Sequence, residues 1–184
     1  MKTYLIIPLI YLTACTNTGQ PSNKGTSTDN SNGSNFTTVT YQEVVKLSVL
    51  VLPPYDEMAN EGISPDVQKF LELVISQDTC LTLLKFPLVK LMGVPYQMIF
   101  DRKYCKPVIE KVKTDIIVMS KLDLVSRTGS MITCKWDLHL RIYNTNIDNQ
   151  INSKVSANNL TIDELKDFLT SKRDQLILEI KNNH

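Results

Sequence analysis

The chain has 184 residues, 42% of them hydrophobic and 21% charged, and its formal net charge at pH 7 is +1. These values fit one globular domain of ordinary size, with enough apolar residues to form a core. A nearly neutral chain has no electrostatic basis for binding nucleic acid or an anionic lipid surface, so we expect no nucleic-acid partner.

The amino-terminal residues have the layout of a secretory signal. Lys2 gives a basic start, residues 4–12 form an apolar run, and the small pair 13–14 precedes Cys15. This layout is typical of a signal peptide that is removed from the mature protein. The apolar run is also shorter than the roughly 20 residues that a transmembrane helix needs. We therefore expect residues 1–14 to be a signal peptide.

The tetrapeptide Leu12-Thr13-Ala14-Cys15 resembles a bacterial lipobox, where a signal peptidase cuts before a cysteine that already carries a diacylglycerol. The resemblance implies lipid attachment at Cys15, with a further acyl group on its new amino terminus. Two or more acyl chains give stable anchoring, so the lipid bilayer becomes a partner through acylated Cys15. Two other interpretations stay open, namely a soluble protein with an apolar amino-terminal strand and an ordinary secretory signal with an incidental cysteine.

The residues after Cys15 indicate where the anchored chain resides. Thr16 stands where the inner-membrane retention signal of enteric bacteria has Asp, so the resemblance implies the outer membrane, on its periplasmic side. Residues 16–36 are rich in Ser, Thr, Asn and Gly. Such a tract cannot bury enough apolar surface to offset the entropy cost of ordering. We expect residues 15–40 to be the lipidated cysteine and a flexible linker, rather than an arm docked on the domain.

The other three cysteines are Cys80, Cys105 and Cys134. An odd number in an exported domain allows at most one disulfide among them and leaves at least one thiol free. Their spacings match no metal-binding template, and a buried free cysteine behaves as a small hydrophobe. One disulfide and three buried thiols are both open interpretations.

The first half of the domain alternates strand and helix patterns. Residues 44–52 are nearly continuously apolar, as in a strand covered on both faces. Ser64-Pro65-Asp66 has the residues preferred at a helix start. The helix that follows has an apolar face of Val67, Phe70, Leu71 and Val74. Residues 79–86 predict a second strand. Residues 88–100 are apolar and contain Gly93 and Pro95, which favours a short helix or turn and then an extended piece, or else an exposed apolar lid.

The second half is richer in strands. Residues 101–112 predict a helix that Asp101 caps or that begins at Pro107, and residues 115–119 predict a strand. Residues 127–130 predict a turn, and residues 132–143 alternate regularly. The apolar face of that long strand consists of Ile132, Cys134, Trp136, Leu138, Leu140 and Ile142. The opposite face, which we expect to be exposed to solvent, consists of Thr133, Lys135, Asp137, His139, Arg141 and Tyr143.

The end of the chain predicts a turn at 144–149, a weak edge strand at 150–157 and a final helix. Thr161 and Glu164 have the spacing of a capping box at the start of that helix. Its apolar face would have Ile162, Leu165, Phe168, Leu169, Leu176 and Ile180. The order of elements predicts an α/β fold over residues 41–184, with a single mixed β-sheet and helices packed on one face, preceded by a disordered tether.

Side chains that carry chemistry are sparse. His139 shares a strand face with Asp137 and Arg141, a grouping that can hint at acid–base chemistry. No Ser or Cys in an activating motif accompanies His139, so we interpret these three as ordinary polar side chains on an exposed strand face. We predict no catalytic, cofactor-binding or metal-ligating residue and no cofactor, and the one site residue is Cys15 for lipid attachment.

Three weaker signals have structural interpretations. Asp56, Glu57 and Glu61 lack the ligand spacing of a calcium loop. Trp136 alternates with core residues, so we expect it to be buried. Four lysines cluster around one predicted helix, namely Lys103, Lys106, Lys111 and Lys113. We interpret them as a solvated helix face rather than as a patch for an acidic partner or a glycan.

The globular part is similar to a periplasmic module. The strand ending at Pro53-Pro54, the segment Val108-Ile109-Glu110-Lys111-Val112-Lys113-Thr114-Asp115-Ile116-Ile117-Val118 and the hairpin end Leu140-Arg141-Ile142-Tyr143-Asn144 are the matching parts. The module occurs in amino-terminal domains of Tol-system propeller proteins, in lipoprotein activators of penicillin-binding proteins and in curli secretion subunits. The chain has Met119-Ser120 where a Gly-Ser pair is usual, and it lacks the usual Thr-Gly at 146–150. The resemblance transfers no functional residue and implies a binding or assembly role in the envelope.

These observations predict a membrane-anchored periplasmic lipoprotein that binds an envelope protein and is not an enzyme. The alternatives are a small envelope ligand-binding protein or enzyme with a site under residues 88–100, and an immunity-type lipoprotein.

Overall fold

The computed structural model describes residues 46–56, 64–95, 99–128 and 133–184. The signal peptide, Cys15, the linker, Glu57, Glu61 and the 129–130 half of the predicted turn lie outside the described residues. The unit from Lys46 to His184 is compact, and both of its hydrophobic clusters are built from residues of that unit alone. We infer that this unit folds independently.

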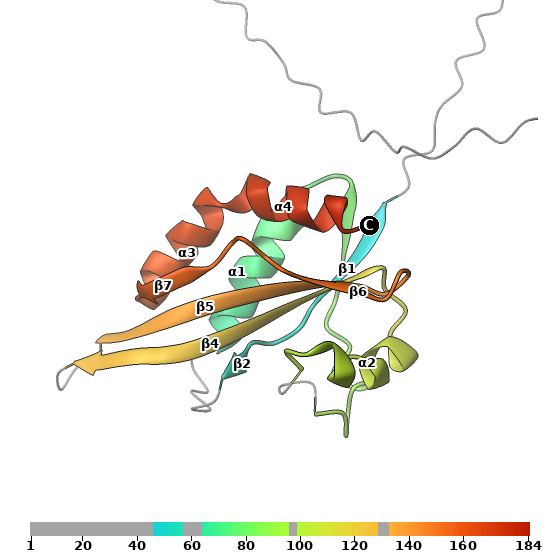
Figure 1. Ribbon diagram of the computed structural model, residues 1–184, viewed down its shortest axis with the longest axis horizontal. Helices are drawn as coiled ribbons and strands as arrows, with labels where there is room; N and C mark the ends of the chain where they lie inside the picture. The colour runs from blue at the N-terminus through green and yellow to red at the C-terminus, as the bar shows by residue number, and fades with distance from the viewer. Residues whose placement is uncertain (1–45, 57–63, 96–98, 129–132) are drawn as a thin grey trace, which may run out of the picture. The chain divides into compact units, whose positions relative to one another are not determined.

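A single mixed sheet forms the middle of the unit (Figure 1). Its path runs β3-β1-β4-β5-β6, while β2 pairs with β4 and β7 pairs with β5. β1 is parallel to both neighbours, and β4 and β5 form a long antiparallel pair. The strands are β1 Leu47–Val51, β2 Tyr55–Asp56, β3 Leu81–Leu84, β4 Ile116–Thr128, β5 Thr133–Asn144, β6 Asn149–Asn152 and β7 Ala157–Leu160. The predicted α/β class with one mixed sheet is confirmed.

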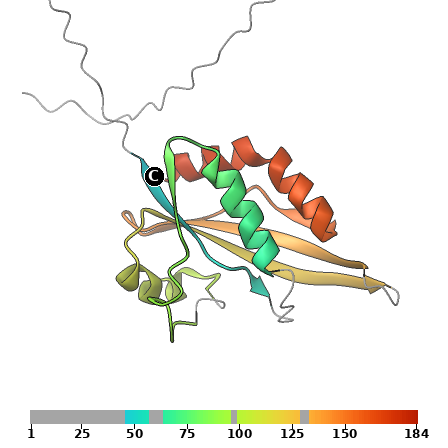
Figure 2. The same cartoon turned by 180° about the vertical axis from the view of Figure 1, so that it is seen from behind.

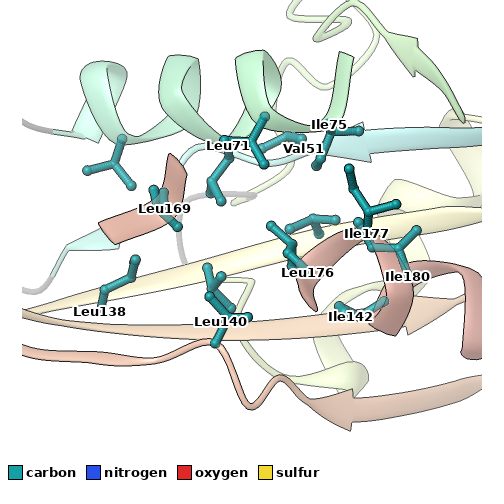
Figure 3. Packing of buried hydrophobic residues seen from close by; sticks show 14 of the residues in the cluster. Val51, Leu71, Ile75, Leu138, Leu140, Ile142, Leu169, Leu176, Ile177 and Ile180 are labelled. Atoms are coloured by element: carbon teal, nitrogen blue, oxygen red, sulfur yellow. The ribbon is translucent and has the colours of Figure 1, made fainter. Parts of the chain in front are cut away.

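Three helices cover one face of the sheet, as predicted (Figures 1 and 2). They are α1 Ser64–Ser76, α3 Ile162–Ser171 and α4 Arg173–Asn182. Leu71 and Ile75 of α1 meet Val51, and Leu176 and Ile180 of α4 lie over Ile142 of β5 (Figure 3). Most residues of the predicted apolar stripes are buried because the helices face the sheet, while Phe70, Ile162 and Phe168 are partly buried against the same core.

The final helix is two helices, where the sequence predicted one. The capping box forms as predicted, because Thr161 accepts a hydrogen bond from the Glu164 amide and the Glu164 carboxylate accepts one from the Thr161 amide. The helix then breaks at Lys172, whose backbone has φ −98° and ψ 8°. The break lets the apolar stripe of α3 and that of α4 follow the same sheet in different directions.

The second face of the sheet is partly covered by short elements. These are the turns at 88–93, the 3₁₀ turn η2 Arg102–Tyr104 and the short helix α2 Lys106–Lys111. Pro107 lies in the first turn of α2, as one of the two interpretations predicted, and Asp101 makes no side-chain cap bond. The sequence of β1 and the residue after it requires this second layer. Val49 and Val51 face the long helices, whereas Leu50 and Leu52 face α2. A strand that is apolar throughout needs cover on both faces.

The apolar alternation of β5 is confirmed from Trp136 to Ile142. The sequence predicted Tyr143 on the solvent-exposed face of β5. This prediction was wrong, because Tyr143 is only 3% exposed and packs with Leu50, Cys105 and Val108 in the hydrophobic cluster beneath α2, which we call the α2 cluster. β4 is also longer than predicted and continues to Thr128. The predicted edge strand at 150–157 is two short strands, β6 and β7, which pair with different stretches of β5.

The cysteine alternatives are reduced by the structure. Cys105 is a buried free thiol and Cys134 a half-buried free thiol. No disulfide therefore joins any two of the three cysteines of the domain. The interpretation with three buried thiols is wrong as well, because Cys134 is only half-buried and Cys80 is not a free thiol. Within the described part of the chain, no helix is both long and apolar enough to cross a membrane.

Candidate functional site

The His139 group does not assemble a catalytic arrangement. His139 Nε2 lies 3.6 Å from Asp123 Oδ2 across the β4–β5 pair, and Asp123 Oδ1 also lies 2.8 Å from the Lys121 ammonium. Asp137 instead accepts a hydrogen bond from the Asn159 amide at 2.7 Å and so holds β7 at its irregular pairing with β5. Asp137 and His139 therefore serve different neighbours.

Arg141, the third member of that group, has a structural role. Its Nη1 donates to the Phe100 carbonyl at 2.5 Å, and its Nε donates to Asn152 Oδ1 at 2.9 Å. The guanidinium also lies 4.2 Å from the centre of the Phe100 ring. Arg141 thus fastens the chain before η2 to the sheet and to β6.

Trp136 is fully buried, as expected. Its indole Nε1 has no hydrogen-bond partner among the described residues. Within the same residues, no group of three or more His, Cys, Asp or Glu side chains is placed to hold a metal ion.

A shallow cleft of about 410 Å³ lies between the η2–α2 layer and the β5–β6 turn. The residues that line it are Arg102, Lys103, Lys106, Ile109, Tyr143 and Asp148. Two of the four predicted basic residues, Lys103 and Lys106, line this cleft, and Lys113 lines the hollow beside it. Lys111 lines neither hollow. The cleft therefore has cationic and apolar walls with one carboxylate, and the predicted cluster is only partly gathered there.

Asp148 holds the two sides of the cleft together. The Arg102 guanidinium pairs with both of its carboxylate oxygens, and the Tyr143 hydroxyl donates to Asp148 Oδ1. Asp148 has a φ of +52°, a left-handed conformation that Asp adopts more readily than most residues. The hydrogen bonds from Tyr143 and Arg102 lower the pKa of Asp148, and burial together with Asp148 raises the pKa of Tyr143 to about 12. The carboxylate stays charged and the phenol stays protonated at neutral pH.

A second hollow, of about 420 Å³, lies at the amino end of β1 and contains Asp115. Asp115 Oδ2 accepts hydrogen bonds from the Ser48 amide at 2.8 Å and from its hydroxyl at 2.7 Å. Asp115 Oδ1 accepts from Asn146 Nδ2 at 3.1 Å. Burial alone would raise the pKa of Asp115, but these hydrogen bonds outweigh it and the pKa is lowered. The group joins β1, β4 and the β5–β6 turn.

The sequence interpretation missed Tyr143, Asp148 and Asp115 as organising residues. Asp148 had a usable signal, since it lies in the predicted turn at 144–149. Asp or Asn can replace a turn glycine because both tolerate a positive φ. The Arg102 partner, 46 residues away, left no local signal.

The described residues of the segment 88–100, namely 88–95 and 99–100, line neither hollow. Leu91, Val94 and Ile99 instead pack against Leu50 and Met119 in the α2 cluster. Arg102, which follows this segment, lies in the Asp148 cleft and pairs with Asp148.

Comparison with known proteins identifies no family, since no family model and no curated protein matches. Among solved structures, the hypothetical protein CT253 from Chlamydia trachomatis is similar at 10% identity and a TM-score of 0.36, over 59% of this chain and 67% of that one. A PelC dodecamer from Paraburkholderia phytofirmans is similar at 5% identity and a TM-score of 0.41, over 78% and 91%. Likeness at this level is too low to support an inference about function.

Proposed function

We propose that the chain is a lipoprotein, anchored through acylated Cys15 at the periplasmic side of the outer membrane, whose folded domain binds an envelope protein without catalysing a reaction. The observation that carries the proposal is the tetrapeptide Leu12-Thr13-Ala14-Cys15 after a basic start and an apolar run. Thirty residues then separate Cys15 from the compact unit that begins at Lys46. A coil of that length has a root-mean-square span of about 30 Å.

The way in which polar groups are used supports binding over chemistry. Arg102, Tyr143 and Asp148 are bonded to one another, and Asp115 is bonded to Ser48 and Asn146. A catalytic acid or base needs an open position toward a substrate. Groups that are committed to one another instead fix the shape of a surface, which is what a binding module requires.

The anchor is tested by metabolic labelling of the full-length chain with an alkyne fatty acid, comparing wild type with Cys15→Ser. We expect label and membrane association for wild type and loss of both for the variant. Cys134→Ser is the matched control, since it removes another thiol and should leave both unchanged. Label that persists in Cys15→Ser would refute the assigned site.

The binding role is tested by in-cell cross-linking of the tagged full-length chain. We expect one envelope protein to be captured by wild type and lost in Cys15→Ser. An Arg102→Glu variant examines whether the cleft takes part, because it opposes Asp148 with a like charge. If the anchored protein captures no envelope protein, the binding role is wrong.

A further inference from the structure

One turn of the second layer exposes apolar side chains that the core does not use. Leu88, Val89 and Met92 are 57%, 81% and 70% exposed, whereas Leu91 between them is fully buried. The Leu91 amide donates to the Pro87 and Leu88 carbonyls, and the Val94 amide donates to the Leu91 carbonyl. We call Leu88, Val89 and Met92 the apolar tip.

The backbone explains why the apolar tip is one surface. The bond from the Leu91 amide to the Pro87 carbonyl gives this stretch a helical turn, in which residues three and four apart lie on the same side. Met92 is three residues from Val89 and four from Leu88, so these exposed side chains lie near one another, while Leu91 is buried. Gly93 then ends the turn with a φ of +77°.

Positive charge is concentrated in the stretch of chain that carries the apolar tip, although the chain as a whole is nearly neutral. Residues 85–106 contain five basic residues and one acidic residue, Asp101. The basic residues are Lys85, Lys90, Arg102, Lys103 and Lys106, and all are exposed. Asp148 pairs with Arg102, and Glu110 lies 4.0 Å from Lys106. Lys85, Lys90 and Lys103 have no acidic side chain as an ion-pair partner within the described residues.

We propose that the apolar tip and its lysines dock on the surface of an anionic lipid bilayer. Apolar side chains that enter the headgroup region, with lysines beside them at the level of the phosphates, are the usual composition of an interfacial membrane contact. Each basic side chain near an anionic surface adds attraction that salt screens. A protein groove would satisfy the apolar side chains equally well, but three lysines without an acidic partner among the described residues favour a continuous anionic surface.

The proposed anchor brings such a surface within reach. The apolar tip follows the carboxyl end of β3, whereas the chain enters the sheet at the amino end of the parallel strand β1. The apolar tip therefore lies at the end of the sheet opposite the amino end of β1. Thirty residues reach about 100 Å when extended, which exceeds a domain diameter of about 40 Å. The tether is thus long enough for the apolar tip to touch the membrane that holds Cys15.

The test uses the independently folding chain 41–184, which lacks Cys15, so that its outcome does not depend on the anchor. We expect it to sediment with vesicles that contain one third phosphatidylglycerol, and to do so less as salt is added. Vesicles of phosphatidylcholine alone should bind it far less. Val89→Asp should weaken binding at least about ten-fold, and Lys90→Glu at least about five-fold.

Two matched control variants change exposed residues of the domain outside the apolar tip. Leu178→Asp introduces the same charge at an apolar residue of α4 that is 57% exposed, and Lys172→Glu reverses an exposed lysine at the α3–α4 break. Both should bind vesicles almost as wild type does. Equal losses in controls and tip variants would overturn the assignment of the apolar tip, and so would absence of binding to acidic vesicles.

A fluorescence measurement tests directly whether residue 89 enters the bilayer. Trp136 is fully buried, so its emission should not respond to lipid. In a Val89→Trp variant we expect a blue shift on adding acidic vesicles, and none in Leu178→Trp. If Val89→Asp instead abolishes capture of an envelope protein while vesicles never bind, the apolar tip docks on protein and the lipid proposal is wrong. Failure of the anchor is seen separately, as loss of the acyl label from the full-length chain.

Discussion

Asp115 is the residue on which the amino end of the sheet depends. Its carboxylate accepts hydrogen bonds from the Ser48 amide, the Ser48 hydroxyl and Asn146, and its own amide donates to the Ser48 hydroxyl. β1, the start of β4 and the β5–β6 turn meet there, far apart in sequence. Hydrogen bonds to a charged group stabilise a fold by about 1.5–3 kcal/mol each, more than neutral ones.

We predict that Asp115→Asn lowers the free energy of unfolding by about 2 kcal/mol, because an amide retains only one acceptor oxygen for these donors. The pKa of Asp115 is lowered in the folded state, so its stabilisation is present at neutral pH and is lost as the pH falls through that folded-state pKa. Urea unfolding of wild type and variant at neutral and acidic pH measures both effects. The difference between them should shrink in acid, and a constant difference would contradict this role.

Cys105 is a second residue whose environment decides its behaviour. It is fully buried, its Sγ lies 3.5 Å from Met119 Sδ, and burial raises its pKa to about 11. Thiol reagents attack the thiolate, which is scarce at pH 8 for such a group. We predict that Cys105→Ala leaves the labelling of the folded chain unchanged and removes one thiol from the count in denaturant. A fall in folded-state labelling would show that Cys105 is accessible.

At the scale of elements, the capping box at α3 combines two hydrogen bonds in one short stretch. The Thr161 hydroxyl accepts from the Glu164 amide at 3.4 Å, and the Thr161 amide donates to the Glu164 carboxylate at 2.7 Å. α3 is ten residues long and is followed directly by a break, so it gains no support from a continuous helix. The cap at its start should therefore contribute a larger share of the stability of α3 than a cap contributes to a long helix.

We predict that Thr161→Ala costs about 1 kcal/mol of stability, the usual cost of losing such a cap. Thr170→Ala is the matched control, since the Thr170 hydroxyl bonds the Lys166 carbonyl within the same helix. The control should be close to neutral, because alanine favours the helix interior. Urea unfolding followed by Trp136 fluorescence compares the two, and equal costs would mean that the cap contributes nothing particular.

The elements that sequence predicted well are those whose signal is local. The alternation from Trp136 to Ile142, the start of α1 and the capping box each need only a few neighbouring residues. β2 and β7 were missed because two and four residues carry no period, and β7 contains Asn158 and Asn159. The break at Lys172 was missed because the apolar spacing continues across it.

The candidate site was predicted poorly for a related reason. Tyr143 follows the same alternation as His139 and Arg141, but it lies where α2 covers the sheet, so it is buried while His139 is not. Only the three-dimensional arrangement brings Arg102 to Asp148. A pattern along one strand reports which residues share a face, and another segment decides whether that face is covered.

At the scale of the whole molecule, a net charge of +1 concealed an uneven distribution. The neutral total predicted no attraction to an anionic lipid surface, yet residues 85–106 carry five basic residues against one acidic residue. Asp148 and Glu110 offset Arg102 and Lys106, whereas Lys85, Lys90 and Lys103 have no acidic ion-pair partner among the described residues. Charges more than about 10 Å apart interact weakly at physiological salt. Net charge is therefore a poor guide to where a charged surface can form on a domain.

The proposed anchor predicts that the location of the chain can be changed without altering the folded domain. Thr16, which directly follows the proposed lipidated cysteine, lies thirty residues before the compact unit that starts at Lys46. In enteric bacteria, Asp at that position is the retention signal of inner-membrane lipoproteins. We predict that Thr16→Asp, expressed in an enteric host, moves the full-length chain from outer-membrane to inner-membrane fractions while its acyl label is unchanged.

Asn17→Asp is the matched control for this prediction, since it adds the same charge one residue further from Cys15. It should leave the chain in the outer membrane, because general repulsion by an added carboxylate would affect both positions alike. Density-gradient separation of the two membranes measures the outcome. Wild type found in the inner membrane would refute the proposed location, and a shift in both variants would point to charge rather than to recognition of the residue after the cysteine.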